Sequence, residues 1–500
     1  MTRVRVERRD ALAAAILSLT ALWLGATARH VAYDDAWITY RYAHNLASGH
    51  GLVYNAGERW LGTTAPGYAV LLGAIASVRP DSIPAISGWL CVLALVVIGL
   101  GLYAFGWLRG SRIAGFAAGL FFVVNPIAVE AFGGEMLPQA AFAVAAFVAQ
   151  AGGRPLVAIG LACAAAILRP DGLLVVGLIG LWQIWQARGL PWRSIALATV
   201  VLGLWFGALW WYYGWPLPQT LGVKHAQRVS GYWRPLGMDL VEWFRAFTPY
   251  GSRFFPGRPA PGFTAWLWLA AAGLVAALWH RGWWPLIAWP VLYLVAYRQL
   301  HLPFYHWYAV PPVLGLASLA GGAVDAIAAL VEHALSRIPG RTSTGRIASA
   351  APAIVCAAAC LVIAMPLARY TAGLAGSGPN PAERAYRELG LWLAAHTSED
   401  TRVGYLEIGI LGYYSRRAIV DPIGLVNPGV ASHVRAGDFL WAYRTHRPDL
   451  ILHNPAFLPE RLGIVLDEPW FRAEYIPVRS FESGRPEPIT VYARRGTRTW

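Results

Sequence analysis

Apolar runs long enough to cross a bilayer recur throughout the first 370 residues of this chain. A helix needs about 20 predominantly apolar residues to span the hydrocarbon core of a membrane. Hydrophobic residues make up 57% of the 500 and charged residues only 14%, whereas about 25% of the residues in a typical soluble domain are charged. The sequence therefore predicts a polytopic α-helical membrane protein.

The positions of the arginines predict how the chain threads the membrane. Lys and Arg are retained on the cytoplasmic side, and an inside N-terminus with about eleven transmembrane helices leaves Arg in every short inner loop. The apolar run at residues 64–78 is short and contains Pro66, so we expect a re-entrant or interfacial helix there. The predicted membrane helices cover residues 11–29, 85–107, 112–130, 137–152, 154–168, 171–187, 194–213, 263–280, 284–299, 308–335 and 346–369.

The net charge of +14 at pH 7 is spread over the loops and is not concentrated in one segment. Such a distribution fits membrane orientation and contact with anionic lipid. The sequence contains no basic segment interleaved with aromatic residues of the kind that binds RNA or DNA. We therefore expect membrane lipid as a partner and no nucleic acid.

The N-terminus admits two interpretations. Basic residues precede an apolar run at residues 11–26, and Ala26-Thr27-Ala28 is similar to a signal cleavage site, so a removed secretory signal is one of them. Cleavage there would leave Asp34 and Asp35 on a loose new N-terminus. We therefore favour an uncleaved signal-anchor helix.

The chain changes in composition from about residue 371. Asn380-Pro381-Ala382-Glu383 predicts the start of a helix, because Pro and an acidic residue both suit the first turn. Short apolar runs broken by Gly, Pro and Asp follow, and such runs are typical of strands. They lie at residues 401–406, 417–420, 449–452 and 489–493. This alternation predicts a small α/β domain outside the membrane.

Two adjacent carboxylates, Asp34 and Asp35, follow the first apolar segment and open an amphipathic helix. Ionisable groups are costly near hydrocarbon, so a pair at the exit of a membrane helix indicates a functional site. Aspartate is also a good helix cap. A cap accounts for one aspartate and not for two.

Further motifs follow the acidic pair in a fixed order. They are residues 48–55 and 57–59; Gly133-Gly134-Glu135-Met136; Leu168-Arg169-Pro170-Asp171-Gly172; Leu217-Pro218-Gln219-Thr220 with Lys224; and residues 407–414 with 420–425. Together with the topology, these motifs resemble the GT-C glycosyltransferases, which take sugars from polyprenyl-phosphate carriers. The arabinofuranosyltransferases of actinobacterial cell walls and related lipid-linked sugar transferases are similar. The motif at Glu135 keeps the acidic residue of the family but not its neighbours.

The resemblance implies an enzyme, an inverting glycosyltransferase in the cytoplasmic membrane with its active site on the outer face. Its donor would be a polyprenyl-phosphate sugar, an arabinofuranosyl donor being one candidate, and its acceptor an envelope glycan, lipid or protein. The implied organisation is a catalytic transmembrane module at residues 1–213 with a first outer loop at 30–84. An outer loop and variable transmembrane module at 214–370 follow, and then an extracytoplasmic α/β domain at 371–500.

The first acid of the pair, Asp34, matches the catalytic carboxylate of the family. Transfer from a sugar phosphate needs a base to deprotonate an acceptor hydroxyl, and a carboxylate at the membrane surface suits that role. Asp35 then either raises the proton affinity of Asp34 by repulsion or helps it to bind a divalent cation, such as Mg, Mn or Ca, through oxygen ligands. Both alternatives stay open.

Cations on the outer side are the predicted ligands of the donor phosphate, since charge-assisted contacts stabilise a departing anion. They are Arg41, Lys224, His225, Arg228, Arg298, His301 and His306, with Glu135 and Arg169 in supporting roles. Five of them also have a structural interpretation. Lys224 and Arg228 could be solvated or touch lipid headgroups, His301 and His306 flank aromatic residues typical of an interfacial belt, and Arg169 could cap a helix or reach the interface.

Two other classes of function compete with this interpretation. A transporter or lipid flippase predicts charged or broken helices at mid-membrane and paired halves, whereas the charges here collect at outer loops and no half-repeat is visible. A non-catalytic scaffold would only hold the C-terminal domain at the surface. Neither accounts for the ordered motifs.

Overall fold

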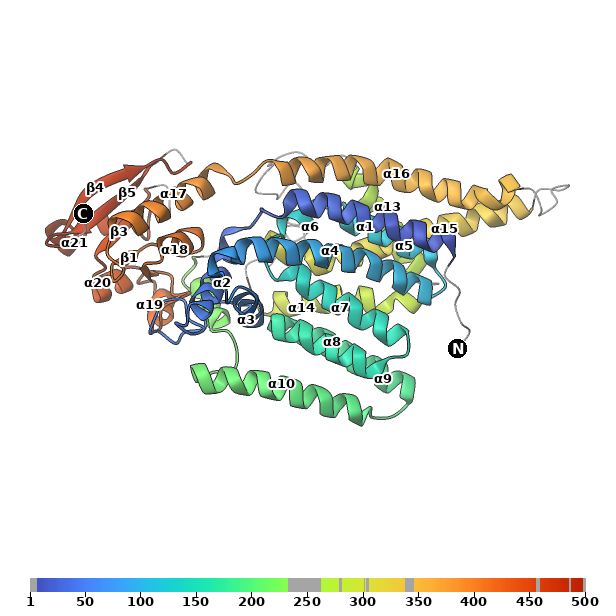
Figure 1. Cartoon of the computed structure of the whole chain (residues 1–500), viewed down its shortest axis with the longest axis horizontal. Coiled ribbons are helices and arrows are strands. Elements are labelled where there is room, and N and C mark those ends of the chain that lie inside the picture. Colours follow the sequence, from blue (N-terminus) through green and yellow to red (C-terminus); the bar gives the residue numbers. More distant parts are fainter. Residues whose placement is uncertain are drawn as a thin grey trace.

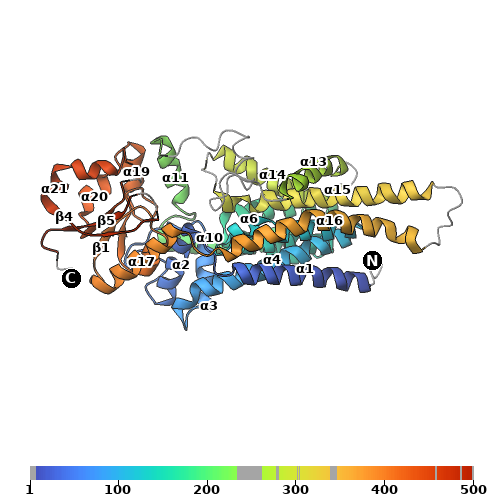
Figure 2. The same ribbon diagram turned by 90° about the horizontal axis from the view of Figure 1, so that it is seen from above.

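The computed structural model describes residues 7–232, 262–277, 281–300, 302, 305–337, 346–455, 459–484 and 487–497. Long helices running side by side form one part of the molecule, and a sheet with short helices forms the other (Figures 1 and 2). The long helices are α1 (Arg8–Ala28), α4 (Ile83–Leu108), α5 (Arg112–Val123), α7 (Met136–Ala151), α8 (Pro155–Leu168), α9 (Leu173–Ala187), α10 (Trp192–Tyr213), α13 (Phe263–Ala277), α14 (Trp284–Gln299), α15 (Val310–Ser336) and α16 (Arg346–Gly376).

Five segments of the described residues are long and apolar enough to cross a membrane. They are Arg8–Ala28, Pro80–Leu108, Trp192–Tyr213, His306–Ser336 and Val355–His396. Shorter apolar helices pack between them: α5 lies against α4 and α15, and α7 lies against α4 and α8. The chain is therefore a multi-pass membrane protein. The count of eleven crossings and their orientation stay predictions.

Small residues let the central helices approach closely. A Cβ atom at Gly106 of α4 would lie 2.6 Å from the Cα of Gly115 in α5, and one at Gly115 would lie 2.9 Å from the carbonyl oxygen of Leu102. Without a hydrophobic driving force between helices in lipid, such close backbone contact is a main source of their association. This packing holds the end of α4 against the start of α5.

One predicted helix is divided in the structure. The prediction of a single helix at residues 112–130 is wrong, because α5 ends at Val123 and a separate turn, α6 (Pro126–Glu130), follows. Pro126 disfavours helical geometry at the residue before it, and the side chain of Asn125 accepts the N–H of Ile127 as an N-cap. The apolar run at 64–78 contains α3 (Pro66–Ile75), whose ten residues reach about 15 Å, half of the hydrocarbon thickness.

Short helices at one end of the bundle connect it to the sheet. They are α2 (Asp34–Ala47), η1 (Pro80–Ser82), η2 (Pro170–Gly172), α11 (Thr220–Val229) and η5 (His306–Ala309); η4 (Arg281–Trp283) lies before α14. Helix α2 packs on α3 and on α18 (Ile410–Ser415), and α11 packs on α19 (Val430–Arg435). Elements far apart in sequence thus meet between the bundle and the sheet (Figure 2).

The C-terminal part holds a five-stranded mixed sheet in the order β2-β1-β3-β5-β4. Its strands are β1 (Arg402–Gly404), β2 (Ala418–Val420), β3 (Leu450–His453), β4 (Tyr475–Phe481) and β5 (Ile489–Arg494). Strand β1 runs parallel to β2 and β3, whereas β5 is antiparallel to β3 and β4. Its other helices are α17 (Pro381–His396), α20 (Trp441–His446), η6 (Gly463–Asp467) and α21 (Pro469–Glu474).

One hydrophobic core continues from the bundle into the sheet. Val403 of β1, Leu450 of β3 and Val491 of β5 belong to the same buried cluster as Leu95 of α4 and Val313 of α15. A second, smaller cluster covers the other side of the sheet around Ile451. The sheet is therefore packed onto the bundle, and the division of the chain into three modules stays a prediction.

Candidate functional site

A cavity of about 450 Å³ is lined by residues of α2, α11, η5 and the segment before α18. Its lining brings together residues from six separate stretches of the chain. They are Tyr33, Asp34, Asp35, Ile38, Thr39, Gly62, Thr63, Thr64, Glu135, Thr220, Lys224, Gln227, Tyr232, Tyr305, His306, Trp307, Tyr308, Leu406, Glu407, Ile408, Ile423 and Leu425. We call this space the acidic cavity, because four carboxylates line it.

The acidic pair forms the first turn of α2, where the partial positive charge of a helix N-terminus favours carboxylates. Asp34 is buried, and its carboxylate accepts the backbone N–H groups of Gly409 (3.3 Å) and Ile410 (2.9 Å). A Cβ atom at Gly409 would overlap Asp34, so only glycine permits this approach. Asp35 is half-buried and lines the same cavity. The two aspartates therefore have different surroundings.

Glu407 adds a carboxylate from the other end of the chain. It lines the cavity between Leu406 and Ile408, and the carbonyl of Ile408 accepts the hydroxyl of Tyr54 at 2.6 Å. Burial raises the pKa of Tyr305, and the negative charges of Asp35 and Glu407 raise it further. The two carboxylates therefore act on the same side of the cavity.

Helix α11 supplies the cation of the cavity. Thr220, Lys224 and Gln227 lie four and three residues apart, which places them on one helix face, and all three line the cavity. Lys224 is buried; its Nζ donates to the hydroxyl of Tyr308 at 3.0 Å and lies 4.7 Å from the ring centre of Tyr305. Aromatic faces attract a cation, so the ammonium group is held at the wall of the cavity.

Other predicted phosphate ligands lie elsewhere. His225 is exposed and Arg228 is half-buried on other faces of α11, and Arg298 is exposed at the end of α14; none lines the cavity. His306 does line it, beside the stacked rings of Tyr33 and Trp307. His301 lies outside the described residues.

Arg41 turns away from the cavity and binds backbone. Its buried guanidinium donates to the carbonyls of Tyr54 (2.8 Å), Arg417 (2.6 Å) and Gly412. Asn55 exchanges two hydrogen bonds of 2.9 Å with the backbone of Ile419. These contacts hold the segment that carries α18 against α2 and its following loop, so Arg41 acts here as a clamp between the two ends of the chain.

Glu135, which lines the acidic cavity, forms a buried ion pair with Arg169. Arg169 also binds Asp171 at 2.8 Å and the hydroxyl of Tyr297 at 2.7 Å. A hydrogen bond holds the turn that precedes Glu135, because the carbonyl of Gly133 accepts the hydroxyl of Tyr40 at 2.6 Å. Arg169 therefore does more than cap α8, because it ties α7, η2 and α14 together.

A second cavity of about 310 Å³ adjoins the first and is mostly apolar. Thr64, Thr220, Lys224 and Tyr308 line both cavities. The remaining walls come from η2, α9, α11 and α14: Arg169, Pro170, Asp171, Leu173, Leu174, Leu217, Pro218, Leu221, Ala296, Tyr297, Leu300 and Leu302. We call this space the apolar cavity. Lys224 thus stands at the junction of an acidic and an apolar space.

Asp421 shapes the far wall of the acidic cavity. It is fully buried and accepts the N–H groups of Ile423 (2.9 Å) and Leu425 (2.5 Å), which places both side chains in the lining. Burial raises the pKa of Asp421 to about 6 despite these bonds. The carbonyl of Leu425 accepts the indole N–H of Trp60 at 3.1 Å.

Within the described ranges, no group of three or more His, Cys, Asp or Glu side chains is placed to hold a metal ion. Both carboxylate oxygens of Asp34 also accept hydrogen bonds from backbone N–H groups. The residues present therefore do not form a ready ligand set. The divalent cation at Asp34 and Asp35 stays a prediction.

Known structures share this architecture. The oligosaccharyltransferase of Archaeoglobus fulgidus, tethered with an acceptor peptide, has a TM-score of 0.59 and 10% sequence identity, and the match covers 98% of this chain and 74% of that one. ArnT from Cupriavidus metallidurans in the apo state has a TM-score of 0.55 at 15% identity, covering 96% and 97%. The chain has the GT-C fold. This confirms the fold that the motifs predicted.

Two further structures of these GT-C proteins contain lipid carriers. ArnT bound to undecaprenyl phosphate matches with a TM-score of 0.51 and 16% identity, covering 96% of this chain and 97% of that one. The archaeal oligosaccharyltransferase AglB in complex with an inhibitory peptide and a dolichol-phosphate matches with 0.54 and 11%, covering 89% and 69%. A family model described as a domain of unknown function (DUF8728) matches residues 376–499. No curated protein matches the sequence.

Proposed function

We propose that this protein is an inverting glycosyltransferase that moves a sugar from a polyprenyl-phosphate donor to an acceptor hydroxyl. The observation that carries the proposal is the junction at Lys224, where a cavity lined by carboxylates meets an apolar one. A lipid-linked sugar needs these two environments side by side, because its prenyl chain is apolar and its reacting end is polar. Lys224 lies where the phosphate between them would sit.

The apolar cavity suits the prenyl chain of the donor. Leucines and prolines of η2, α9, α11 and α14 contribute to its walls. Burial of apolar surface stabilises a bound molecule by about 25 cal/mol of free energy per Å². The Nζ of Lys224 and the hydroxyl of Tyr308, which are 3.0 Å apart, are the groups that would bind the phosphate. The fold shared with ArnT, whose structure contains undecaprenyl phosphate, supports this placement.

The acidic cavity suits the acceptor and the base. A carboxylate removes the proton of the acceptor hydroxyl, the oxygen attacks the anomeric carbon, and the bond to the phosphate oxygen breaks on the opposite face. The lipid phosphate leaves with the electron pair of that bond, and Lys224 stabilises its developing charge. One displacement inverts the configuration of the sugar.

The sequence assigns the base to Asp34 and the supporting role to Asp35, and the contacts favour the opposite division. Hydrogen bonds to a carboxylate stabilise its charged form and lower its proton affinity. Asp34 is 8% exposed and both of its carboxylate oxygens accept backbone N–H groups, whereas Asp35 is half-buried in the lining of the cavity, so an acceptor hydroxyl reaches the Asp35 carboxylate more easily. We therefore propose Asp35 as the base and Asp34 as the residue that positions α18.

The proposed site lies on the outer face of the cytoplasmic membrane. Arginines in the loops at the opposite end of the bundle, such as Arg109, Arg154 and Arg188, support this orientation because basic loops stay inside. The sheet that follows α16 would then be extracytoplasmic, and the acceptor would enter the cavity on the side that faces the sheet. An arabinofuranosyl donor and a role in cell-wall synthesis stay predictions.

A transfer assay with the purified full-length protein tests the proposal. The protein is incubated with a panel of radiolabelled polyprenyl-phosphate sugars and an envelope-lipid and glycan extract, with Asp35→Asn as the matched inactive control. We expect label to leave one donor in the wild type and not in the variant. Donor binding without release of the polyprenyl phosphate, on every donor tested, would favour a flippase or transporter instead.

A further inference from the structure

A third cavity, of about 410 Å³, shares no lining residue with the acidic cavity. Its lining comes from the residues that follow α1 and α16, from α2, from the start of α4, and from α17 and α18. The lining residues are Arg29, His30, Val31, Ala32, Trp37, Pro84, Ala85, Trp89, Gly378, Pro379, Glu383, Arg384, Arg387, Ile410 and Tyr414. We call this space the basic cavity, because three arginines face one glutamate in it.

The arginines of the basic cavity keep their charge available. The guanidinium of Arg29 donates to the carbonyl of Ala26, and that of Arg384 donates to the carbonyl of Pro379 at 2.8 Å. The guanidinium of Arg387 lies 5.2 Å from the ring centre of Tyr414. None of these three contacts is with a carboxylate, so none neutralises the charge.

The glutamate of this cavity is engaged in its own helix. Glu383 is buried and forms a capping box with Asn380: its carboxylate accepts the N–H of Asn380 at 2.9 Å, and the side chain of Asn380 accepts the N–H of Glu383 at 2.9 Å. A capping box satisfies two N–H groups of a helix start. The positive charge of the cavity therefore exceeds the negative charge that faces it.

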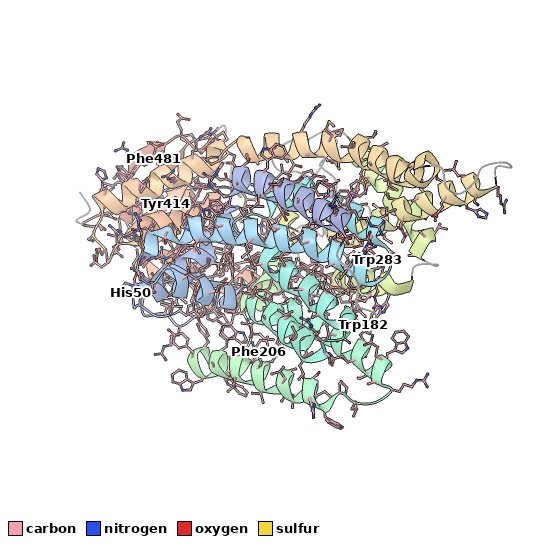
Figure 3. The ribbon with its side chains drawn as sticks, turned by 45° about the vertical axis from the view of Figure 1, so that its right-hand side comes forward. His50, Trp182, Phe206, Trp283, Tyr414 and Phe481 are labelled. Atoms are coloured by element: carbon pink, nitrogen blue, oxygen red, sulfur yellow. The ribbon has the colours of Figure 1, made fainter. Side chains whose placement is uncertain are left out.

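The basic cavity lies at a boundary of the membrane. Arg29 directly follows the membrane span of α1, and Trp89 lies in the first turns of α4. Tyr414 and His50 lie at the end of the bundle nearest the sheet, whereas Trp182 and Trp283 lie at the opposite end (Figure 3).

An apolar surface continues from the cavity into the membrane. Trp89 is 53% exposed, and Leu93, one turn further along α4, is 58% exposed. Residues four apart share a helix face, so this pair forms a track that leads away from Arg29 along α4. Arg29 itself lies 5.7 Å from the ring centre of Trp89.

We propose that the basic cavity binds the phosphate headgroup of an anionic lipid of the outer leaflet, with an acyl chain along Trp89 and Leu93. Guanidinium groups bind phosphate oxygens through two parallel N–H bonds, and basic pockets between membrane helices bind lipid headgroups. A soluble phosphate would make no use of the apolar track. The site is separate from the donor site, since no lining residue is shared.

Bound lipid would also support the acidic cavity. Ile410 lines the basic cavity with its side chain while its backbone N–H binds Asp34. A headgroup held between Arg29 of α1 and Arg387 of α17 would therefore fix α18 in the position that Asp34 requires. This consequence rests on the proposed function, whereas the binding itself does not.

Native mass spectrometry of the full-length protein in detergent tests the binding. Dioleoyl-phosphatidylglycerol is compared with zwitterionic dioleoyl-phosphatidylcholine at equal concentration. We expect one retained phosphatidylglycerol and at least tenfold weaker retention of phosphatidylcholine. Equal retention of the two lipids would overturn the proposal, and so would displacement of phosphatidylglycerol by an equal concentration of inorganic phosphate, because the acyl chain would then contribute nothing.

Variants decide which cavity holds the lipid. Combined Arg29→Gln, Arg384→Gln and Arg387→Gln should weaken phosphatidylglycerol retention at least tenfold, and the corresponding triple change to Lys should retain most of it. Arg435→Gln, an exposed arginine on α19, and Lys224→Gln should leave retention unchanged.

A folded triple Gln variant that retains the lipid as the wild type does, or loss of the lipid on Lys224→Gln, would refute the assignment. If the triple variant does not fold, as judged by size-exclusion chromatography, Arg387→Gln alone replaces it. That single change should weaken retention about threefold, and unchanged retention would overturn the proposal.

Discussion

Asparagine substitutions at the two aspartates should affect the protein in different ways. Asn at position 35 keeps the size of the side chain but cannot accept the proton of a hydroxyl. A positioned general base contributes a factor of about 10²–10⁴ to the rate. Because Asp35 lines the cavity half-buried, we expect Asp35→Asn to lower kcat by about that factor and to leave the apparent Tm unchanged.

Asp34→Asn should act through the fold. An amide offers one oxygen where the carboxylate offers two, so either the N–H of Gly409 or that of Ile410 loses its acceptor. A hydrogen bond to a charged group contributes about 1.5–3 kcal/mol, and we expect a lower apparent Tm together with a partial loss of kcat. Gly409→Ala should reproduce this result, because its Cβ would overlap Asp34.

Single-turnover transfer of labelled sugar and thermal unfolding in detergent measure the two effects. Glu399→Gln, an exposed carboxylate before β1, serves as the matched control and should change neither. The proposed division would be refuted by near wild-type turnover of Asp35→Asn combined with an inactive Asp34→Asn of normal Tm. That result would return the base to Asp34, where the sequence resemblance placed it.

Three further outcomes follow from the site and the topology. Lys224→Ala should weaken donor binding about 10- to 150-fold, the equivalent of one charge-assisted contact of about 1.5–3 kcal/mol, as measured by donor titration; unchanged affinity would place Lys224 against lipid headgroups. The pKa of Asp421 is raised from 3.8 to about 6, so its stabilisation is complete below pH 3.8 and is lost as the pH rises through 6. Between pH 5 and 7.5 the wild type should therefore lose about 1 kcal/mol relative to Asp421→Asn, visible as a steeper fall of the apparent Tm; parallel curves would argue against this. Single cysteines at Ser48 and Ser432 should react with an impermeant reagent on intact cells, and one at Thr342, outside the described residues, should not; reaction at Thr342, or none at Ser432, would contradict the topology.

Local patterns in the sequence predicted several parts of the site. The acidic pair opens a helix because Asp suits a first turn, and α2 begins at Asp34. The pair, Glu135, Lys224 and His306 all line one cavity, as expected from their charge, from their predicted loops and, for all but His306, from the motifs that resemble the family. Topology made this possible, because segments at the same end of a helical bundle have to meet.

Other features of the site depend on tertiary contacts, which local sequence patterns do not reveal. Arg41 binds the carbonyl of Arg417, 376 positions further along the chain, and no spacing within α2 reveals that partner. His225 was predicted as a phosphate ligand, but the face of α11 that lines the cavity carries Thr220, Lys224 and Gln227. Glu407 stands at the start of a motif noted in the sequence, but only the tertiary structure shows that it lines the same cavity as the acidic pair.

The C-terminal part forms one wall of the acidic cavity. Arg41 is 6% exposed with its guanidinium on backbone carbonyls of the 412–417 segment, and Asp34 is 8% exposed with its carboxylate on the N–H groups of 409 and 410. Without that segment, both charges would lose partners that offset their burial, and a charged group left without a partner costs more than the bond itself gave. Glu407 would also leave the cavity. Residues 376–499, which match the domain of unknown function, therefore contribute part of the lining of the acidic cavity.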